Sequence, residues 1–171
     1  MQELTSLIRD IPDFPKPGIN FRDITPVLQN PTGFKEIIDS FTERYQSQNI
    51  QGIAGIESRG FLIAAPLAKE LELPLLLIRK KGKLPFKTKS ITYDLEYGTD
   101  SLEIHIDSAA KSDRIVLIDD LLATGGTLAA AAKLIESLGA TVVELGVIIE
   151  LVDLNGRSKL NELPTYSLCQ A

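Results

Sequence analysis

The sequence predicts an α/β fold, with a mostly parallel, twisted β-sheet and helices on both faces. Apolar runs of strand length alternate with segments of helix length, which is the order of βαβ units. Most of these runs are continuously apolar, as in strands that are buried on both faces. Polar and glycine-rich segments follow the runs directly, at the position where open parallel sheets bind ligands.

The N-terminal segment differs from the rest in its proline content. Residues 1–10 predict a short amphipathic helix. Pro12, Pro15 and Pro17 then predict an extended segment, because proline interrupts a helix. From Gly33 onward, a helix that covers the sheet is predicted by apolar residues spaced i, i+3, i+4, i+7 and i+11: Phe34, Ile37, Ile38, Phe41 and Tyr45.

Two βαβ units follow along the chain. The first is predicted as strand 52–57, a helix from about 59 to 70, and strand 74–79. The second is predicted as strand 114–118, a helix from about 127 to 138, and strand 141–150. Between the units, residues 90–97 and 101–107 alternate apolar and polar side chains around Gly98, which indicates a β-hairpin or a pair of strands at the sheet edge.

Composition narrows the class of protein. The 171 residues fit one domain, and 44% hydrophobic with 24% charged residues is ordinary for a globular chain. A net charge of −5 and a pI near 5.0 argue against nucleic-acid binding, which relies on clustered Lys and Arg. One cysteine, no apolar signal-peptide core and no apolar run of about 18 residues lead us to expect a cytoplasmic protein without a membrane partner.

The loop after strand 114–118 has the composition of a phosphate-binding loop. Ala123-Thr124-Gly125-Gly126-Thr127 combines small residues, which let backbone N–H groups approach an anion, with two hydroxyl donors and a following helix N-terminus. The loop has neither a Walker lysine nor the dinucleotide pattern G-x-G-x-x-G. The alternative is a strand-to-helix turn that needs glycine for its shape alone.

Asp119 and Asp120 stand directly before this loop. Carboxylates repel a phosphate unless they engage something else, either hydroxyl groups or a hard cation such as Mg²⁺. A ribose 5-phosphate unit satisfies both features, with its phosphate on 124–127 and its hydroxyls near 119–120. In the alternative interpretation, the two acids only end a buried strand in solvent.

The stretch VLIDDLLATGGT (residues 116–127) resembles the phosphoribosyl pyrophosphate (PRPP) motif of the type I phosphoribosyltransferases. Four other segments look like the members of that family that use adenine: FPKPGINFRDITP (14–26), GIESRGF (55–61), LIRKKGKLP (77–85) and LEYGTDSLEIH (95–105). The resemblance spans almost the whole chain. It implies one phosphoribosyltransferase domain over residues 1–171, with an N-terminal base-binding extension over the site (1–32) and a mobile loop and hairpin (80–107).

The implied activity is that of a glycosyltransferase. Adenine displaces pyrophosphate from PRPP and gives AMP, in a Mg²⁺-dependent reaction of purine salvage. The implied partners are adenine, PRPP and a second copy of the chain. The Mg²⁺ is expected to arrive with PRPP, near Asp119 and Asp120, rather than at a dedicated protein site.

The resemblance also implies roles for cationic residues. Arg59 matches the pyrophosphate-binding arginine, and Ser58 before it is expected to bind pyrophosphate as well. Relatives often have a cis Glu57–Ser58 peptide in this loop. Arg79, Lys80 and Lys83 match PRPP-contacting positions, which relatives partly donate across a dimer interface, so a homodimer is expected. The alternatives are a surface helix residue for Arg59 and a solvated basic loop for residues 79–89.

Two further roles come from the same comparison. Glu96 matches the proposed acid/base residue and, with Arg59, is the catalytic candidate; a solvent-facing strand glutamate is its alternative. Asn20, Phe21 and Arg22 match the adenine-binding segment, where Phe21 can stack on a purine. Relatives commonly have an aliphatic residue at position 20. A core role is the alternative for Phe21.

Three other functions fit parts of the sequence. One is a phosphoribosyltransferase for hypoxanthine, guanine, xanthine or orotate. Another is a non-catalytic regulator that senses PRPP or a nucleotide, although 171 residues at pI near 5.0 leave little room for a nucleic-acid-binding attachment. The weakest is a P-loop hydrolase, because the loop lacks the Walker lysine.

Overall fold

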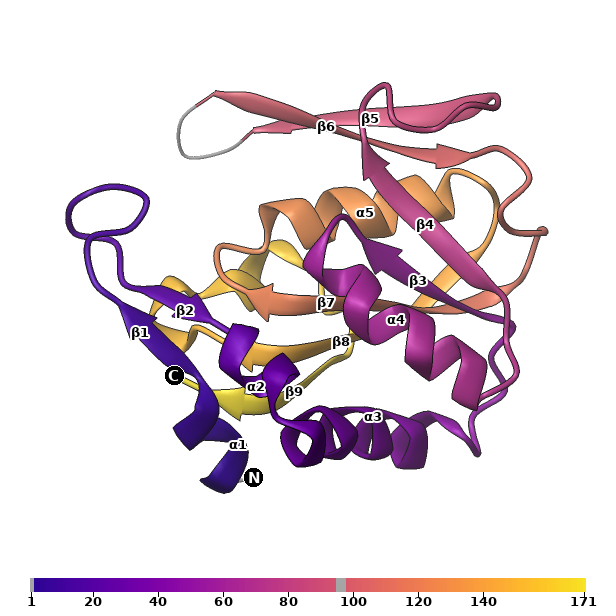
Figure 1. The fold of residues 1–171 in the computed structure, drawn as a ribbon. Helices are drawn as coiled ribbons and strands as arrows, with labels where there is room; N and C mark the ends of the chain where they lie inside the picture. The colour runs from indigo at the N-terminus through magenta and orange to yellow at the C-terminus, as the bar shows by residue number, and fades with distance from the viewer. Residues whose placement is uncertain (1, 95–97) are drawn as a thin grey trace.

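The computed structural model describes residues 2–94 and 98–171 and has a central seven-stranded sheet in the order β5-β6-β4-β3-β7-β8-β9 (Figure 1). Its parallel strands are β3 (Gly52–Ile56), β4 (Leu75–Lys80), β7 (Arg114–Leu122), β8 (Thr141–Glu150) and β9 (Thr165–Gln170). The antiparallel strands β5 (Thr88–Asp94) and β6 (Thr99–His105) complete one edge. The mostly parallel sheet is therefore confirmed.

Helices cover both faces of this sheet, as predicted. On one face lie α3 (Pro31–Tyr45) and α4 (Arg59–Glu70), and on the other lies α5 (Gly126–Glu136) (Figure 1). Each face has its own hydrophobic cluster: Ile37, Phe41, Ile63 and Leu67 belong to the first, and Leu128, Ala131 and Ile135 belong to the second. Both clusters include side chains of β3, β7 and β8, so the centre of the sheet is buried on both faces.

The helix α3 begins and packs as its sequence indicates. Asn30 accepts a hydrogen bond from the backbone N–H of Gly33 at 3.0 Å, which caps the first turn, and Pro31 stands where proline is tolerated. Near the other end, the Tyr45 hydroxyl donates to Glu144 of β8 at 2.9 Å, and Arg44 pairs with the same carboxylate. These bonds tie the helix to the sheet.

The N-terminal segment contains more structure than predicted. The helix α1 covers only Gln2–Leu7 of the predicted 1–10, because Arg9–Ile11 forms β1, which pairs with β2 (Phe21–Asp23). The proline-rich residues form the loop between these strands, and α2 (Thr25–Gln29) follows. Figure 1 shows this loop projecting on the side toward which β7 points, so the extension approaches the carboxyl ends of the parallel strands.

The predicted hairpin is confirmed at the sheet edge, with shifted boundaries. Strands β5 and β6 pair from Thr88↔His105 to Asp94↔Thr99, and β6 also pairs with β4. The second strand was predicted to end at residue 107, and this is wrong, because β6 ends at His105. Residues 95–97 lie outside the described part of the chain.

Two features of the fold were not predicted. The strand β9 joins the edge of the sheet next to β8, after two 3₁₀ helices at Val152–Leu154 and Gly156–Lys159. The strand β4 is not buried on both faces, since Leu75 and Leu77 are 38% and 37% exposed. Within residues 2–94 and 98–171, no helix is both long and apolar enough to span a membrane.

Candidate active site

Three segments with charged side chains meet at the carboxyl ends of the parallel strands, as predicted. They follow the carboxyl ends of β3, β4 and β7, and β3 pairs in parallel with both of its neighbours. Glu57 and Arg59 follow β3, Arg79 and Lys80 end β4, and Asp119 lies near the end of β7. Parallel pairing thus places cationic and acidic groups side by side.

The predicted phosphate loop lines a cavity of about 200 Å³. Gly125, which directly precedes helix α5, has the left-handed conformation, with a φ of 79°, which favours glycine. Arg59 and the two aspartates form the rest of the cavity's polar lining. The residues predicted to bind the phosphate and ribose of PRPP line it together with Arg59: Asp119, Asp120, Ala123, Thr124, Gly125, Gly126 and Thr127. The other residues predicted to bind pyrophosphate are not among its lining residues: Ser58, Arg79, Lys80 and Lys83.

The surroundings of Asp119 and Asp120 disfavour the charged form of both carboxylates. Asp120 is 3% exposed, so the alternative in which both acids end in solvent is wrong for this residue. Its backbone N–H donates to Asp119 Oδ1 at 2.9 Å, and Arg59 Nε lies 3.1 Å from Asp120 Oδ2, which nevertheless accepts no well-directed hydrogen bond. Burial raises the pKa of Asp119, and the charge of Asp120 raises it further. Burial also raises the pKa of Asp120, although Arg59 opposes the shift.

Two of the predicted pyrophosphate-binding cations, Arg79 and Lys83, pair with one carboxylate, that of Glu57. Arg79 Nε donates to Glu57 Oε2 at 3.2 Å, the Lys80 N–H donates to the same oxygen at 3.1 Å, and the Lys83 ammonium pairs with Oε1. Burial opposes ionisation of Glu57, but these bonds hold its pKa below the usual value. The sequence did not indicate this partner, although Glu57 is the one acid directly between the apolar strand 52–56 and Arg59.

The backbone next to Glu57 has the expected geometry. The Glu57–Ser58 peptide is cis, as the resemblance implied, and the Ser58 side chain is exposed beside Arg59. The Lys80 ammonium lies 3.2 Å from Asp100 of β6. Every cation that was predicted to bind pyrophosphate therefore has a carboxylate partner within the protein.

A second cavity, of about 650 Å³, adjoins the first and contains the predicted base-binding residues Asn20, Phe21 and Arg22. The two cavities share Leu121, Ala123 and Thr124 as lining residues. Sequence reasoning missed the far wall, because its residues come from the C-terminal segment: Leu151, Asp153, Leu154 and Ala171.

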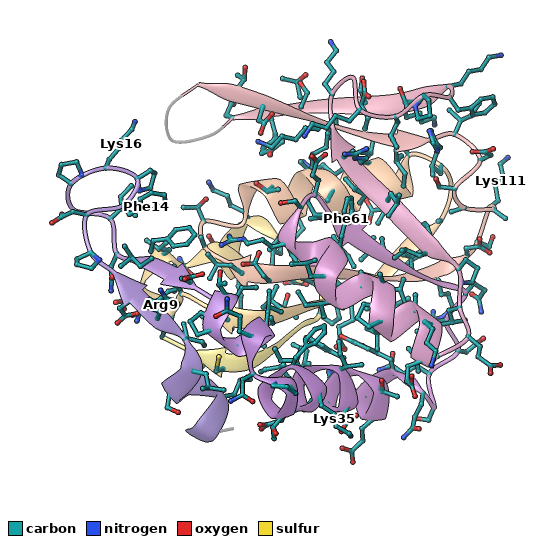
Figure 2. All side chains as sticks on the ribbon, in the orientation of Figure 1. Arg9, Phe14, Lys16, Lys35, Phe61 and Lys111 are labelled. Atoms are coloured by element: carbon teal, nitrogen blue, oxygen red, sulfur yellow. The ribbon has the colours of Figure 1, made fainter. Side chains whose placement is uncertain are left out.

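Phe21 lines the larger cavity and lies close to Arg59, which lines the smaller one. Its ring meets the Phe14 ring edge to face at 5.3 Å, and the Arg59 guanidinium lies 5.1 Å from its centroid. Figure 2 shows Phe14 on the projecting loop between β1 and β2. Phe21 is partly exposed and lines the cavity, so the alternative of a plain core residue is wrong.

The hairpin reaches the phosphate loop through one described contact. The Thr127 hydroxyl donates to the Tyr93 hydroxyl of β5 at 3.2 Å. Glu96, the predicted acid/base residue, lies outside the described residues. Its role stays a prediction.

Comparisons with known proteins agree with this geometry. A sequence profile described as "Phosphoribosyl transferase domain" matches residues 23–164. The chain therefore belongs to the phosphoribosyltransferase family. Adenine phosphoribosyltransferase of Chloroflexus aurantiacus is 57% identical over 169 residues, which are 99% of this chain and 98% of the relative. The enzyme of Acaryochloris marina is 57% identical over 168 residues, 98% of this chain and 99% of the relative.

Solved structures of adenine phosphoribosyltransferases share the fold. The enzyme of Thermoanaerobacter pseudethanolicus matches with a TM-score of 0.96 and 48% identity, over 99% of each chain. That of Saccharomyces cerevisiae, crystallised with an imino-altritol bisphosphate and adenine, matches with a TM-score of 0.92 and 40% identity, over 98% of this chain and 97% of that one.

We expect Asp119→Asn to stabilise the empty protein at pH 8, because asparagine keeps the oxygen that accepts the Asp120 N–H and removes a charge that burial disfavours. The melting temperature should rise by about 2–4 °C, the shift that ~1 kcal/mol produces in a chain of this size. Folding raises the pKa of Asp119, so the wild-type protein loses stability as pH rises from about 4 through the raised value. The gain should therefore vanish at or below pH 4.

Differential scanning calorimetry at several pH values measures this effect. Asp107→Asn, at an exposed position remote from the cavity, is the control and should change stability by less than about 0.5 kcal/mol. A lower melting temperature for Asp119→Asn at pH 8 contradicts the expectation.

Proposed function

We propose that the protein transfers the 5-phosphoribosyl group from PRPP to adenine, giving AMP and pyrophosphate in purine salvage. The observation that supports this most directly is the pair of adjoining cavities, one with a phosphate loop and acidic pair, the other with an aromatic residue and apolar walls. A ribose bound across Leu121, Ala123 and Thr124 faces both. The names of the close relatives agree with this assignment.

The charges of the site suit bond cleavage at the anomeric carbon. In the transition state the ribose becomes cationic and the departing pyrophosphate gains negative charge. Asp119 and Asp120 lie where they can hold the ribose hydroxyls and stabilise positive charge on the sugar. Arg59, Arg79, Lys80 and Lys83 can hold the pyrophosphate once it replaces their carboxylate partners.

Recognition of adenine is assigned to the extension formed by residues 1–32. Phe21 presents a ring to the cavity, and the backbone groups of Asn20 and Arg22 can pair with the polar edge of the base. The Arg22 guanidinium is already paired with Asp10, so its side chain holds the extension together rather than contacting the base. Exposed Asn20 adds a side-chain amide to the cavity wall.

The donor groups of the site fit a Mg²⁺ that is shared with PRPP. Among the described residues, no three His, Cys, Asp or Glu side chains are grouped as a cation site. Asp119 and Asp120 supply only part of an oxygen coordination shell, so PRPP oxygens and water must supply the rest. When bound, Mg²⁺ neutralises charge on the pyrophosphate.

A homodimer is proposed from an exposed apolar surface. Leu62 of α4 and Leu75 and Leu77 of β4 are between 37% and 48% exposed, and α4 and β4 are in contact. An apolar surface of this kind is typical of a protein–protein interface. It lies next to Arg79 and Lys80 at the end of the same strand, so a partner subunit there would adjoin the site.

Two alternatives remain for the experiments to distinguish. A phosphoribosyltransferase for another base would share the phosphate cavity and differ in the base cavity. A regulator that senses PRPP would bind it without turnover.

A cytoplasmic location, where the substrates of salvage are expected, is part of the proposal.

The central test is turnover with each base. We expect the protein, PRPP and Mg²⁺ to release pyrophosphate with adenine and to form AMP, and to lose this activity when EDTA removes Mg²⁺. Hypoxanthine, guanine, xanthine and orotate are the controls and should react at least about 100-fold more slowly, because polar groups arranged for adenine are left unpaired by other bases. Faster turnover with hypoxanthine than with adenine rules out the assignment, and binding of PRPP without turnover favours the regulator.

Glu96→Gln tests the acid/base role of the hairpin. If Glu96 moves a proton on adenine as the new bond forms, kcat should fall by about 10²–10⁴-fold while PRPP affinity changes little. Asp119→Asn is the contrasting variant, because it should weaken PRPP binding as well. Unchanged kcat in Glu96→Gln shows that Glu96 transfers no proton.

Leu77→Glu tests the dimer. A buried charge at an apolar interface is unfavourable, so the variant should be monomeric in light scattering coupled to size-exclusion chromatography, whereas the wild type should be a dimer. Ile106→Glu, at a 43% exposed residue outside α4 and β4, is the matched control and should remain dimeric. A monomeric wild type contradicts the proposal.

A further inference from the structure

The phosphate loop is in close backbone contact with a turn that lies 30 residues further along the chain. A Cβ atom on Gly156 would lie 2.2 Å from the carbonyl oxygen of Ala123 and 2.8 Å from Leu122 Cδ1. A Cβ atom on Gly125 would lie 2.3 Å from the carbonyl oxygen of Gly156. Glycine is therefore required on both sides of this contact, and Gly156 is buried there.

The turn that carries Gly156 is held from the opposite side. Arg157 donates to both oxygens of Glu150, at 2.6 and 2.7 Å, and to the Thr165 carbonyl at 3.1 Å. Glu150 is 5% exposed and also accepts from Ser167 at 3.0 Å. These bonds anchor the turn to the end of β8 and the beginning of β9.

This anchoring decides which side of the contact yields to an added methyl group. The turn is fixed by a bidentate ion pair whose carboxylate is buried, whereas loop residues 123–127 form part of the cavity wall. Relief of the contact requires a shift of roughly 1 Å, from 2.2 Å to an ordinary van der Waals distance. The shift therefore falls on Ala123 and on the loop N–H groups that follow it.

We propose that Gly156 is a positioning residue for the phosphate site, and that the Glu150–Arg157 pair is its anchor. Gly156 acts through the loop and contacts no substrate itself. Its backbone sets the position of Ala123 and Gly125, and so the direction of the N–H groups that receive the 5-phosphate. This inference rests on the proposed function, since it takes ribose 5-phosphate as the group that the loop binds.

Gly156→Ala tests this role. Binding of ribose 5-phosphate, measured by isothermal titration calorimetry, should weaken by about tenfold or more, the effect expected of a 1 Å displacement in a binding site. The KM for PRPP should rise in parallel, and the KM for adenine at saturating PRPP should change by less than about twofold. General damage to the fold would change both constants, so this split separates positioning from a merely structural role.

The control is Gly33→Ala. An added Cβ there meets the flexible end of Leu7 at 2.8 Å, in a helix remote from the cavity, so ribose 5-phosphate affinity should stay that of the wild type. Unchanged affinity in Gly156→Ala overturns the proposal. Failure of the wild-type protein to bind ribose 5-phosphate instead counts against the proposed function.

Arg157→Lys decides the question if Gly156→Ala does not fold. Lysine keeps the charge next to Glu150 and loses the bidentate geometry, so the anchor loosens while the buried carboxylate stays paired. We expect a native circular dichroism spectrum with ribose 5-phosphate affinity lowered by about threefold or more. A native spectrum with unchanged affinity overturns the proposal.

Discussion

Two adjacent carboxylates at the end of β7 impose the main electrostatic constraint on this protein. Asp120 is almost fully buried, its Oδ2 atom has no well-directed hydrogen bond, and burial raises the pKa of both acids. Such an arrangement is unfavourable in the empty protein and becomes favourable only when hydroxyl groups or a cation reach the carboxylates. Two neighbouring elements complete the surroundings of the pair: Arg59, at the start of α4, lies beside Asp120 and partly offsets its charge, and the glycine loop that we propose for the phosphate follows on the same chain.

The topology of the sheet makes this arrangement possible. Because β4, β3 and β7 are adjacent and parallel, their carboxyl ends present separate chemical groups to one ligand without any long loop. The cavity that we propose for the base is built differently, from the N-terminal extension and the C-terminal segment, which lie outside the βαβ units. The phosphoribosyl part of the site thus belongs to the core of the fold, and the base-binding part belongs to its additions.

The sequence predicts the phosphoribosyl part of the site better than the part proposed for the base, and the reason is physical. Strands β3, β7 and β8 contain apolar runs, and residues 119–127 directly follow the apolar run 115–118 of β7, so local signals suffice to find them. Long-range contacts determine the rest. The role of Glu57 depends on its pairing with Arg79 and Lys83. The role of Gly156 depends on its contact with Ala123, and the short strand β9 forms by pairing with β8. The assignment of Phe21 came from family resemblance, and that of Glu96 stays a prediction.

The Glu57 carboxylate has a further consequence for selectivity among anions. It pairs with Arg79 and Lys83, so an incoming anion must compete with this carboxylate for both cations. A singly charged ion such as chloride exchanges one partner for an equivalent one and gains little. A ligand with several charges, held at the same time by the phosphate loop, is displaced far less easily. Pairing with Glu57 thus disfavours the binding of common cellular anions to Arg79 and Lys83.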